Sequence, residues 1–131
     1  MSTPSKLASL AMLQALSNYL DQGGPNASLV FYDDVKPESV NIAVNDSAKL
    51  LTLTFPKPCL SSIEADYVEL QPSNAGVVVK ASTPIWARLF NAAGDAVVDV
   101  DVGDGADITL DNYVFAVGAS IKLDAIYLSP I

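Results

Sequence analysis

The chain has 131 residues, half of them apolar, and its fifteen acidic and seven basic side chains give a net charge of −8. This length fits one domain over residues 1–131, and the single Cys59 cannot form a disulfide within the chain. The acidic excess argues against nucleic acid as a ligand, because phosphate binding depends on Lys and Arg. No stretch reaches the roughly 20 apolar residues of a membrane span, so we expect no membrane contact. The mean hydropathy of +0.33 is high for a charged chain and suggests that some apolar surface contacts a partner.

The N-terminal segment carries the signals of a helix. Thr3 or Ser2 is the expected N-cap, with Pro4 near the first helical position, and Gly23–Pro25 is the stop signal. Together these signals predict a helix over residues 4–21.

Apolar side chains cover more than one side of this predicted helix. Its leucines recur at every third position from 7 to 16, a spacing that drifts around a helix of about 3.6 residues per turn. Two interpretations are open: the helix lies deep against the sheet, or it is shared between subunits. For the second interpretation, the expected intersubunit surface consists of Leu13, Leu16, Tyr19 and Leu20.

From residue 28 onward, short runs rich in β-forming residues alternate with Asn, Asp, Gly and Pro. This spacing is typical of all-β domains. We therefore predict a mainly β chain, an antiparallel β-sandwich (jelly-roll-like or immunoglobulin-like) over residues 28–128, with one N-terminal α-helix. We expect eight of these ten segments to be strands: Ser28–Tyr32, Val40–Val44, Lys49–Phe55, Asp66–Leu70, Gly76–Lys80, Ile85–Asn91, Ala96–Val102, Asp107–Leu110, Tyr113–Val117 and Ser120–Leu128.

Two connections between the predicted strands have clear turn residues. Asn91–Asp95 reads N-A-A-G-D and is predicted to be a hairpin loop in which Gly94 takes a positive φ. Phe55–Ser62 contains Pro56 and Pro58, which have no N–H to donate to a sheet. We therefore predict that this second segment is a loop and a contact arm.

The residues of common active sites are missing. The sequence has no histidine and neither of the usual phosphate-binding glycine motifs, which leaves a pair of carboxylates as the remaining enzymatic hypothesis. Asp99 and Asp101 would lie on one face of a strand, about 7 Å apart. The alternative is that these acids discourage pairing at a strand edge. We expect no catalytic residues and no enzymatic activity.

The acidic run Asp99–Asp107 is similar to half of a calcium-binding loop. It departs from the EF-hand pattern, because Gly103, Asp104 and Leu110 stand where that pattern needs Asp or Asn, Gly and Glu. Another calcium geometry is an open alternative. We favour a tight glycine-containing turn, bonded by the carboxylate of Asp104 or Asp107, with no metal and no cofactor.

Aromatic side chains have two possible uses in a β domain of this size. They supply large buried area to a core, which is the interpretation we favour, or they form an exposed platform that stacks on sugar rings. Arg88 shares a strand face with Trp86, which predicts a cation-π contact or a buried ion pair with an Asp. The aromatic residues concerned are Tyr32, Tyr67, Trp86, Tyr113 and Tyr127.

The segment Thr83–Leu128 combines an aromatic-x-Arg strand, a Gly-containing hairpin, the run V-G-D-G-A-D that ends at Asp107, and a final strand from Gly118. With these motifs it resembles small virion proteins of tailed bacteriophages and prophages. The N-terminal part is similar as well, with an Ala/Leu helix that ends in Gly-Gly, a strand that closes on F-Y-D, and Pro37. Residues 38–82 are outside the resemblance, and Asp101 stands where that family commonly has Gly. The resemblance implies a structural role in the virion, without catalytic residues to carry over.

The first functional hypothesis is therefore a virion structural protein, either a capsid decoration or cement protein or a component of the tail or its fibres. Such a protein is made in the host cytoplasm and located in the virion. Its expected partners are further copies of itself, in a homo-oligomer, and other virion proteins such as a major capsid or tail protein. The second hypothesis is a carbohydrate-binding β-sandwich module, and the third is a carboxylate-dependent hydrolase.

Overall fold

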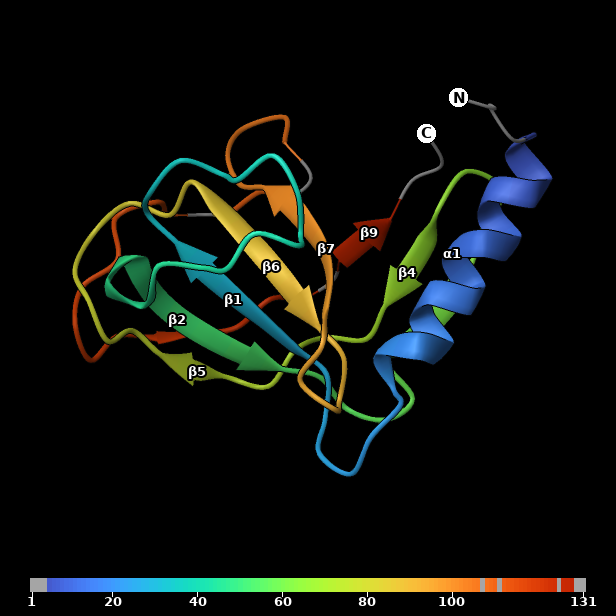
Figure 1. The fold of residues 1–131 in the computed structure, drawn as a ribbon, viewed down its shortest axis with the longest axis horizontal. Coiled ribbons are helices and arrows are strands. Elements are labelled where there is room, and N and C mark those ends of the chain that lie inside the picture. The colour runs from blue at the N-terminus through green and yellow to red at the C-terminus, as the bar shows by residue number, and fades with distance from the viewer. Residues whose placement is uncertain (1–4, 107, 111, 125, 129–131) are drawn as a thin grey trace.

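The structure is a computed structural model that describes residues 5–106, 108–110, 112–124 and 126–128. Within these residues the chain is mainly β, with one α-helix at its N-terminal end (Figure 1). This confirms the predicted fold class. The elements are α1 (Lys6–Leu20), β1 (Ser28–Tyr32), a short 3-10 turn (Asp46–Ala48), β2 (Lys49–Thr54), β3 (Leu60–Ile63), β4 (Val68–Leu70), β5 (Gly76–Val77), β6 (Trp86–Phe90), β7 (Ala96–Asp101), β8 (Ser120–Ile121) and β9 (Ile126–Leu128).

The strands form three antiparallel sheets. Their orders are β2-β1-β6-β7, β3-β4-β9 and β5-β8. The two larger sheets share one core, to which β1 contributes Leu29 and Phe31, β4 contributes Leu70 and β9 contributes Ile126. β7 ends one of these sheets and β9 ends the other, and no described strand joins the two edges. The chain is therefore an open β-sandwich.

The side chains of β6 alternate between the two faces of the four-stranded sheet. In β6 the side chains of Ala87 and Leu89 enter the shared core, whereas those of Trp86 and Arg88 lie on the opposite, outer face of the sheet. All four are buried, because both faces of this sheet are covered.

The hairpin between β6 and β7 is confirmed. Asn91 closes it, since its side-chain Oδ1 accepts hydrogen bonds from the backbone N–H groups of Ala93 (3.1 Å) and Asp95 (2.8 Å). Gly94 takes the predicted positive φ, at 94°.

The helix is shorter than predicted. It begins at Lys6, where the Oγ of Ser5 accepts a hydrogen bond from the N–H of Ala8 at 3.2 Å, and it ends at Leu20. The predicted cap at Thr3 or Ser2 is therefore wrong, because Ser5 performs this role later in the sequence. Residues 1–4, which include the predicted first helical residue, lie outside the described residues.

Several other predicted boundaries are also wrong. Val40–Val44 forms no strand, and the carbonyl of Ile42 accepts from the Arg88 side chain instead of from a neighbouring strand. Phe55–Ser62 is a loop only in its first part, because β3 begins at Leu60. Asp66–Leu70 and Gly76–Lys80 shorten to β4 and β5.

The C-terminal part contains less regular strand than predicted. The described residues of Asp107–Leu110 and of Tyr113–Val117 make only isolated bridges, at Ile108 and at Phe115. Ser120–Leu128 divides into β8 and β9, which belong to different sheets. These segments make isolated bridges instead of continuous ladders, so the alternation in the sequence overstates the length of their strands.

The connection between β1 and β2, residues 33–48, crosses the outer face of the four-stranded sheet, and we call it the strap. Figure 1 shows it in cyan and teal in front of β1 and β6. The strap covers a cluster in which the rings of Tyr32 and Trp86 stack with their centroids 4.5 Å apart. Apart from the 3-10 turn at its end, the strap has no regular structure, and irregular connections of this length are uncommon in compact domains. Specific contacts must therefore hold it in place.

A buried ion pair supplies the central contact of the strap. The guanidinium of Arg88 donates to both carboxylate oxygens of Asp99, at 2.6 and 3.0 Å, and also to the carbonyl of Ile42 at 2.8 Å. The side chains of Arg88 and Asp99 are only 3% and 8% exposed. The guanidinium also lies 5.4 Å from the centre of the Trp86 ring, so both contacts predicted for Arg88 are confirmed.

Two further contacts hold the N-terminal half of the strap. The indole N–H of Trp86 donates to Asp34 at 2.8 Å, and Lys36 forms an ion pair with Asp101 at 2.9 Å. Asp99 and Asp101 therefore lie on one face of β7, as predicted, but each carboxylate binds a different cation.

Replacing Arg88→Met is expected to destabilise the protein by about 3 to 5 kcal/mol, because it leaves the Asp99 carboxylate buried without a counter-charge. The double variant Arg88→Met, Asp99→Leu should recover most of this loss, since no charge is left buried. Urea unfolding followed by the fluorescence of Trp86, the single tryptophan, measures both variants. A single variant that is no less stable than the double variant would contradict this account of the strap.

Candidate functional site

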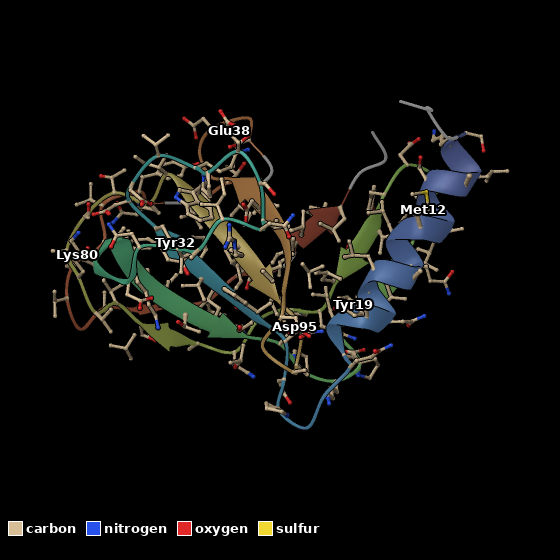
Figure 2. The ribbon with its side chains drawn as sticks, in the orientation of Figure 1. Met12, Tyr19, Tyr32, Glu38, Lys80 and Asp95 are labelled. Atoms are coloured by element: carbon tan, nitrogen blue, oxygen red, sulfur yellow. The ribbon has the colours of Figure 1, made fainter. Side chains whose placement is uncertain are left out.

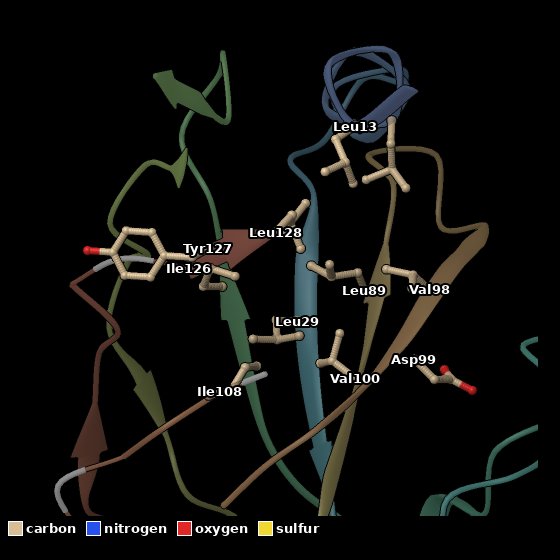
Figure 3. Close-up of a pocket in the computed structure, with 11 residues that line it drawn as sticks. Leu13, Leu29, Leu89, Val98, Asp99, Val100, Ile108, Ile126, Tyr127 and Leu128 are labelled. Carbon is tan, nitrogen blue, oxygen red and sulfur yellow. The ribbon is translucent and has the colours of Figure 1, made fainter. Parts of the chain in front are cut away.

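An apolar groove lies between the helix and the open side of the sandwich. Its volume is about 340 Å³, at the lower end of the range for binding pockets. Figure 3 shows its aliphatic side chains converging from four directions. They come from the helix (Leu13, Leu16), the inner face of the large sheet (Leu29, Leu89, Val98, Val100), the segment after β7 (Ile108) and β9 (Ile126, Leu128).

The helix is fixed to the rest of the chain at its C-terminal end. The carboxylate of Asp21 accepts from the backbone N–H of Cys59 at 3.0 and 3.2 Å, and the thiol of Cys59 donates to the carbonyl of Ser17 at 3.3 Å. The carbonyl of Leu20 accepts from the N–H of Ala92 in the β6–β7 hairpin at 2.9 Å. Figure 2 labels Tyr19 on the helix and Asp95 in the hairpin.

Gly23 permits this close approach of the helix end and the hairpin. A Cβ at position 23 would lie 2.4 Å from the backbone nitrogen of Ala93, and the φ of 130° disfavours any other residue. The anchored end thus sets the position of Leu13 and Leu16 along the groove.

Two polar residues border the groove but direct their side chains elsewhere. Figure 3 shows the carboxylate of Asp99 and the ring of Tyr127 pointing away from the aliphatic cluster. Asp99 binds Arg88 on the outer face of the sheet, and Tyr127 packs edge-to-face on Tyr67 with ring centroids 5.1 Å apart. The groove therefore presents aliphatic side chains and strand backbone.

The four side chains expected at an intersubunit surface lie in three different surroundings. Leu13 and Leu16 line the groove. Tyr19 is 41% exposed and is not part of its lining. The expectation that Leu20 is part of an intersubunit surface is wrong, because its side chain is 0% exposed and belongs to the core.

Sequence reasoning missed the sheet side of the groove. Val98, Val100, Ile126 and Leu128 alternate along β7 and β9, a pattern that assigns them to an inner face. That pattern does not show whether another strand covers the inner face. This information lies in the pairing of distant strands.

The alternative of a sugar platform is not realised by the aromatic residues that the structure describes. Trp86 and Tyr32 are buried beneath the strap, as the core interpretation predicted. Tyr127 differs from that interpretation, since it is 51% exposed, and its edge-to-face contact with Tyr67 leaves no flat pair of rings. Tyr113 is half-buried and donates its hydroxyl to Asp104 at 3.1 Å.

The acidic run after β7 forms a tight turn, as predicted. The φ angles of Gly103 and Gly105 are 153° and 75°, and the N–H of Ile108 donates to the carbonyl of Asp101 at 3.0 Å. Asp107, one of the two carboxylates expected to bond this turn, lies outside the described residues. Among the residues that the structure describes, no three His, Cys, Asp or Glu side chains gather as metal ligands.

The charges near the groove leave a negative excess. Within the described part of the chain, ion pairs join Lys6 to Asp66, Lys36 to Asp101, Lys80 to Asp33 and Arg88 to Asp99. In that same part, two carboxylates next to β7 form no ion pair, namely Asp95 before the strand and Asp104 after it. Both side chains are exposed.

One buried thiol and one buried hydroxyl group have strongly raised pKa values. Burial raises the pKa of the Cys59 thiol from 9.0 to about 12, and the nearby negative charge of Asp21 adds to this. Burial likewise raises the pKa of the Tyr32 hydroxyl from 10.0 to about 12. Both groups are therefore protonated in the folded protein at neutral pH, and the thiol is a packed side chain and not a nucleophile.

The protein is expected to lose stability at alkaline pH. The unfolded chain releases protons from Cys59 above its pKa of 9.0 and from Tyr32 above 10.0, whereas the folded chain holds both until about 12. The contribution of these two groups to the free energy of unfolding is thus complete below pH 9.0 and is lost as the pH rises through their folded-state pKa values. Urea unfolding across this window measures the loss, and Tyr32→Phe should reduce its slope. An unchanged slope in that variant would contradict the role of Tyr32.

Comparison with known proteins finds no relative of this chain. No family model matches the chain, and neither a curated protein nor a solved structure does. In the described residues, no helix combines the length and apolar character needed to cross a bilayer.

Proposed function

We propose that the chain is a structural protein of a bacteriophage particle, either a capsid decoration protein or a tail component, that acts by binding other proteins through the groove. The observation that carries the proposal is the aliphatic lining of the groove, to which nine side chains contribute and of which Leu13, Leu16, Val98 and Leu128 are partly exposed. An apolar concavity of this kind is the usual form of a binding site. The similarity of the sequence motifs to small virion proteins supplies the choice of partner class.

Contacts between copies of the chain belong to the same proposal. Large apolar side chains are exposed away from the groove as well, around β5, which Figure 1 places at the end of the molecule opposite the helix. The N–H of Gly118 donates to the carbonyl of Val78 at 3.0 Å, which places the segment before Gly118 next to β5. The exposed side chains of these segments are Val77, Val79, Val114 and Val117.

Carbohydrate binding has weaker support. The largest aromatic side chains, Trp86 and Tyr32, are covered by the strap and hydrogen-bonded or stacked in its core. A hydrolase based on Asp99 and Asp101 has weaker support too, because each carboxylate already binds a cation.

The variant Leu16→Glu should be excluded from phage particles, because it places a charge on the apolar wall of the groove. Mass spectrometry of particles purified from a lysate of the bacterial host measures the abundance of this variant relative to the wild-type chain. We expect a loss of at least about tenfold, which corresponds to about 1.4 kcal/mol of binding free energy.

Ala15→Glu is the matched control, since it adds the same charge at the neighbouring helix position, where the side chain is exposed. It should enter particles as the wild type does. Urea unfolding of both variants separates a binding defect from a folding defect. A wild-type chain that is abundant in the cell and absent from particles would overturn the proposed function.

A further inference from the structure

The groove is bordered by the unpaired edges of two strands. β7 and β9 are the last strands of their sheets in the described part of the chain, and the side chains of both contribute to the groove. An unpaired edge carries a row of N–H and C=O groups that can bind an additional strand. Aliphatic side chains at alternate positions of such a strand would then enter the groove.

The hydrogen bonds around β7 show which backbone groups face its free edge. The N–H of Val102 donates to Ile85 in the direction of β6, at 3.1 Å, and the register pairs Arg88 with Asp99. Since backbone groups alternate along an antiparallel strand, the N–H and C=O of Asp99 point away from β6. The carbonyl of Asp101, on the same side, accepts from Ile108, which limits the available edge to the part before Asp101.

Side chains that usually protect an edge are neutralised on β7. The carboxylates of Asp99 and Asp101 bind Arg88 and Lys36 on the outer face of the sheet. The sequence-based alternative that these acids discourage edge pairing is therefore not supported by their placement. Charge is uncompensated only beyond the two ends of the strand, at Asp95 and Asp104 among the described residues.

We infer that the groove binds an extended segment of another protein, which adds to the edge of β7 as a strand, inserts alternate aliphatic side chains between the helix and the sheet, and carries Lys or Arg on both flanks. The segment spans about five residues, since the part of β7 before Asp101 has five. The flanking cations face Asp95 and Asp104. This inference deepens and rests on the proposed function, because it names the partner that the groove accepts.

Charge decides between this partner and the other occupants. A second copy of the chain brings a further net charge of −8 and offers few free cations. A small apolar molecule would satisfy the aliphatic lining but not the backbone groups of Asp99. A basic, extended segment satisfies the lining, the edge and the charge together.

The test selects peptides from a random library of twelve-residue sequences, displayed without a carrier protein, against the immobilised full chain. We expect enriched sequences with an aliphatic residue at every second position and Lys or Arg on both sides of this run. A synthetic peptide of the most enriched sequence should bind the wild-type chain and Ala15→Glu equally, and bind Leu16→Glu at least about tenfold more weakly. Added salt should weaken its binding, because the flanking contacts are electrostatic.

Hydrogen exchange supplies a readout that needs no variant. The peptide should slow exchange of the backbone amide of Asp99 in the wild-type chain, since that N–H becomes a donor to the added strand. Exchange at the exposed helix residue Ala15 should not change.

Four results would overturn the inference: no enrichment, enriched peptides with helical spacing, peptides that bind Leu16→Glu as tightly as the wild type, or an unchanged Asp99 amide. Binding of decanoate without peptide enrichment would assign the groove to a small apolar ligand. Light scattering that shows an oligomer lost only in Leu16→Glu would assign it to a second copy. Each of these outcomes is compatible with a chain that is present in particles, so it leaves the role in the virion standing. Binding of decanoate would remove only the groove as the protein-binding surface of that role.

Discussion

The ion pair between Arg88 and Asp99 sets which side chains of β7 face outward to the strap and which face inward to the groove. Because Asp99 turns its carboxylate outward to Arg88, its neighbours Val98 and Val100 turn inward to the groove. The same guanidinium holds the strap through the carbonyl of Ile42. A shift of one residue in this strand would place the carboxylate among aliphatic side chains and expose the valines, so the ion pair fixes the register as well as the strap.

The place where the helix is attached explains why the sandwich stays open, since Lys6 at its start pairs with Asp66 between β3 and β4. Asp21, Leu20 and Gly23 bind the end of α1 to the loop at Cys59 and to the β6–β7 hairpin. The remaining turns of the helix pack beside β3 and β4, beyond the free edge of β7, instead of closing over it (Figure 1). An apolar wall, two strand edges and a neutralised outer face therefore meet at one place. Their combination, more than any one of them, supports a protein-binding groove.

The sequence predicted the parts of this arrangement that depend on local patterns. The strand β1, the hairpin at Gly94 and the shared face of Asp99 and Asp101 follow from alternation and turn residues over a few positions. Arg88 was also predicted to meet either an aromatic ring or an acid, and it meets both. Leu13 and Leu16 were identified because their spacing exceeds what one buried stripe of a helix needs.

What the sequence did not predict depends on distant pairings. Val40–Val44 has strand-forming residues, but its neighbour in space is the Arg88 side chain and not a strand. Leu20 looks like its neighbours in the helix, yet the tight approach at Gly23 places it in the core. The open edge of the sandwich is a property of which strands lack neighbours, and no local pattern encodes it.

The central claim is that a partner covers the groove in the assembled particle, and thiol labelling of Leu16→Cys tests it most directly. The native Cys59 is buried and its pKa is raised to about 12, so it contributes little background in the folded chain. The account predicts that maleimide labels the thiol introduced by Leu16→Cys readily in the isolated protein and only slowly in particles, while an Ala15→Cys control is labelled in both. Equal labelling of the groove position in isolated protein and in particles would contradict the account.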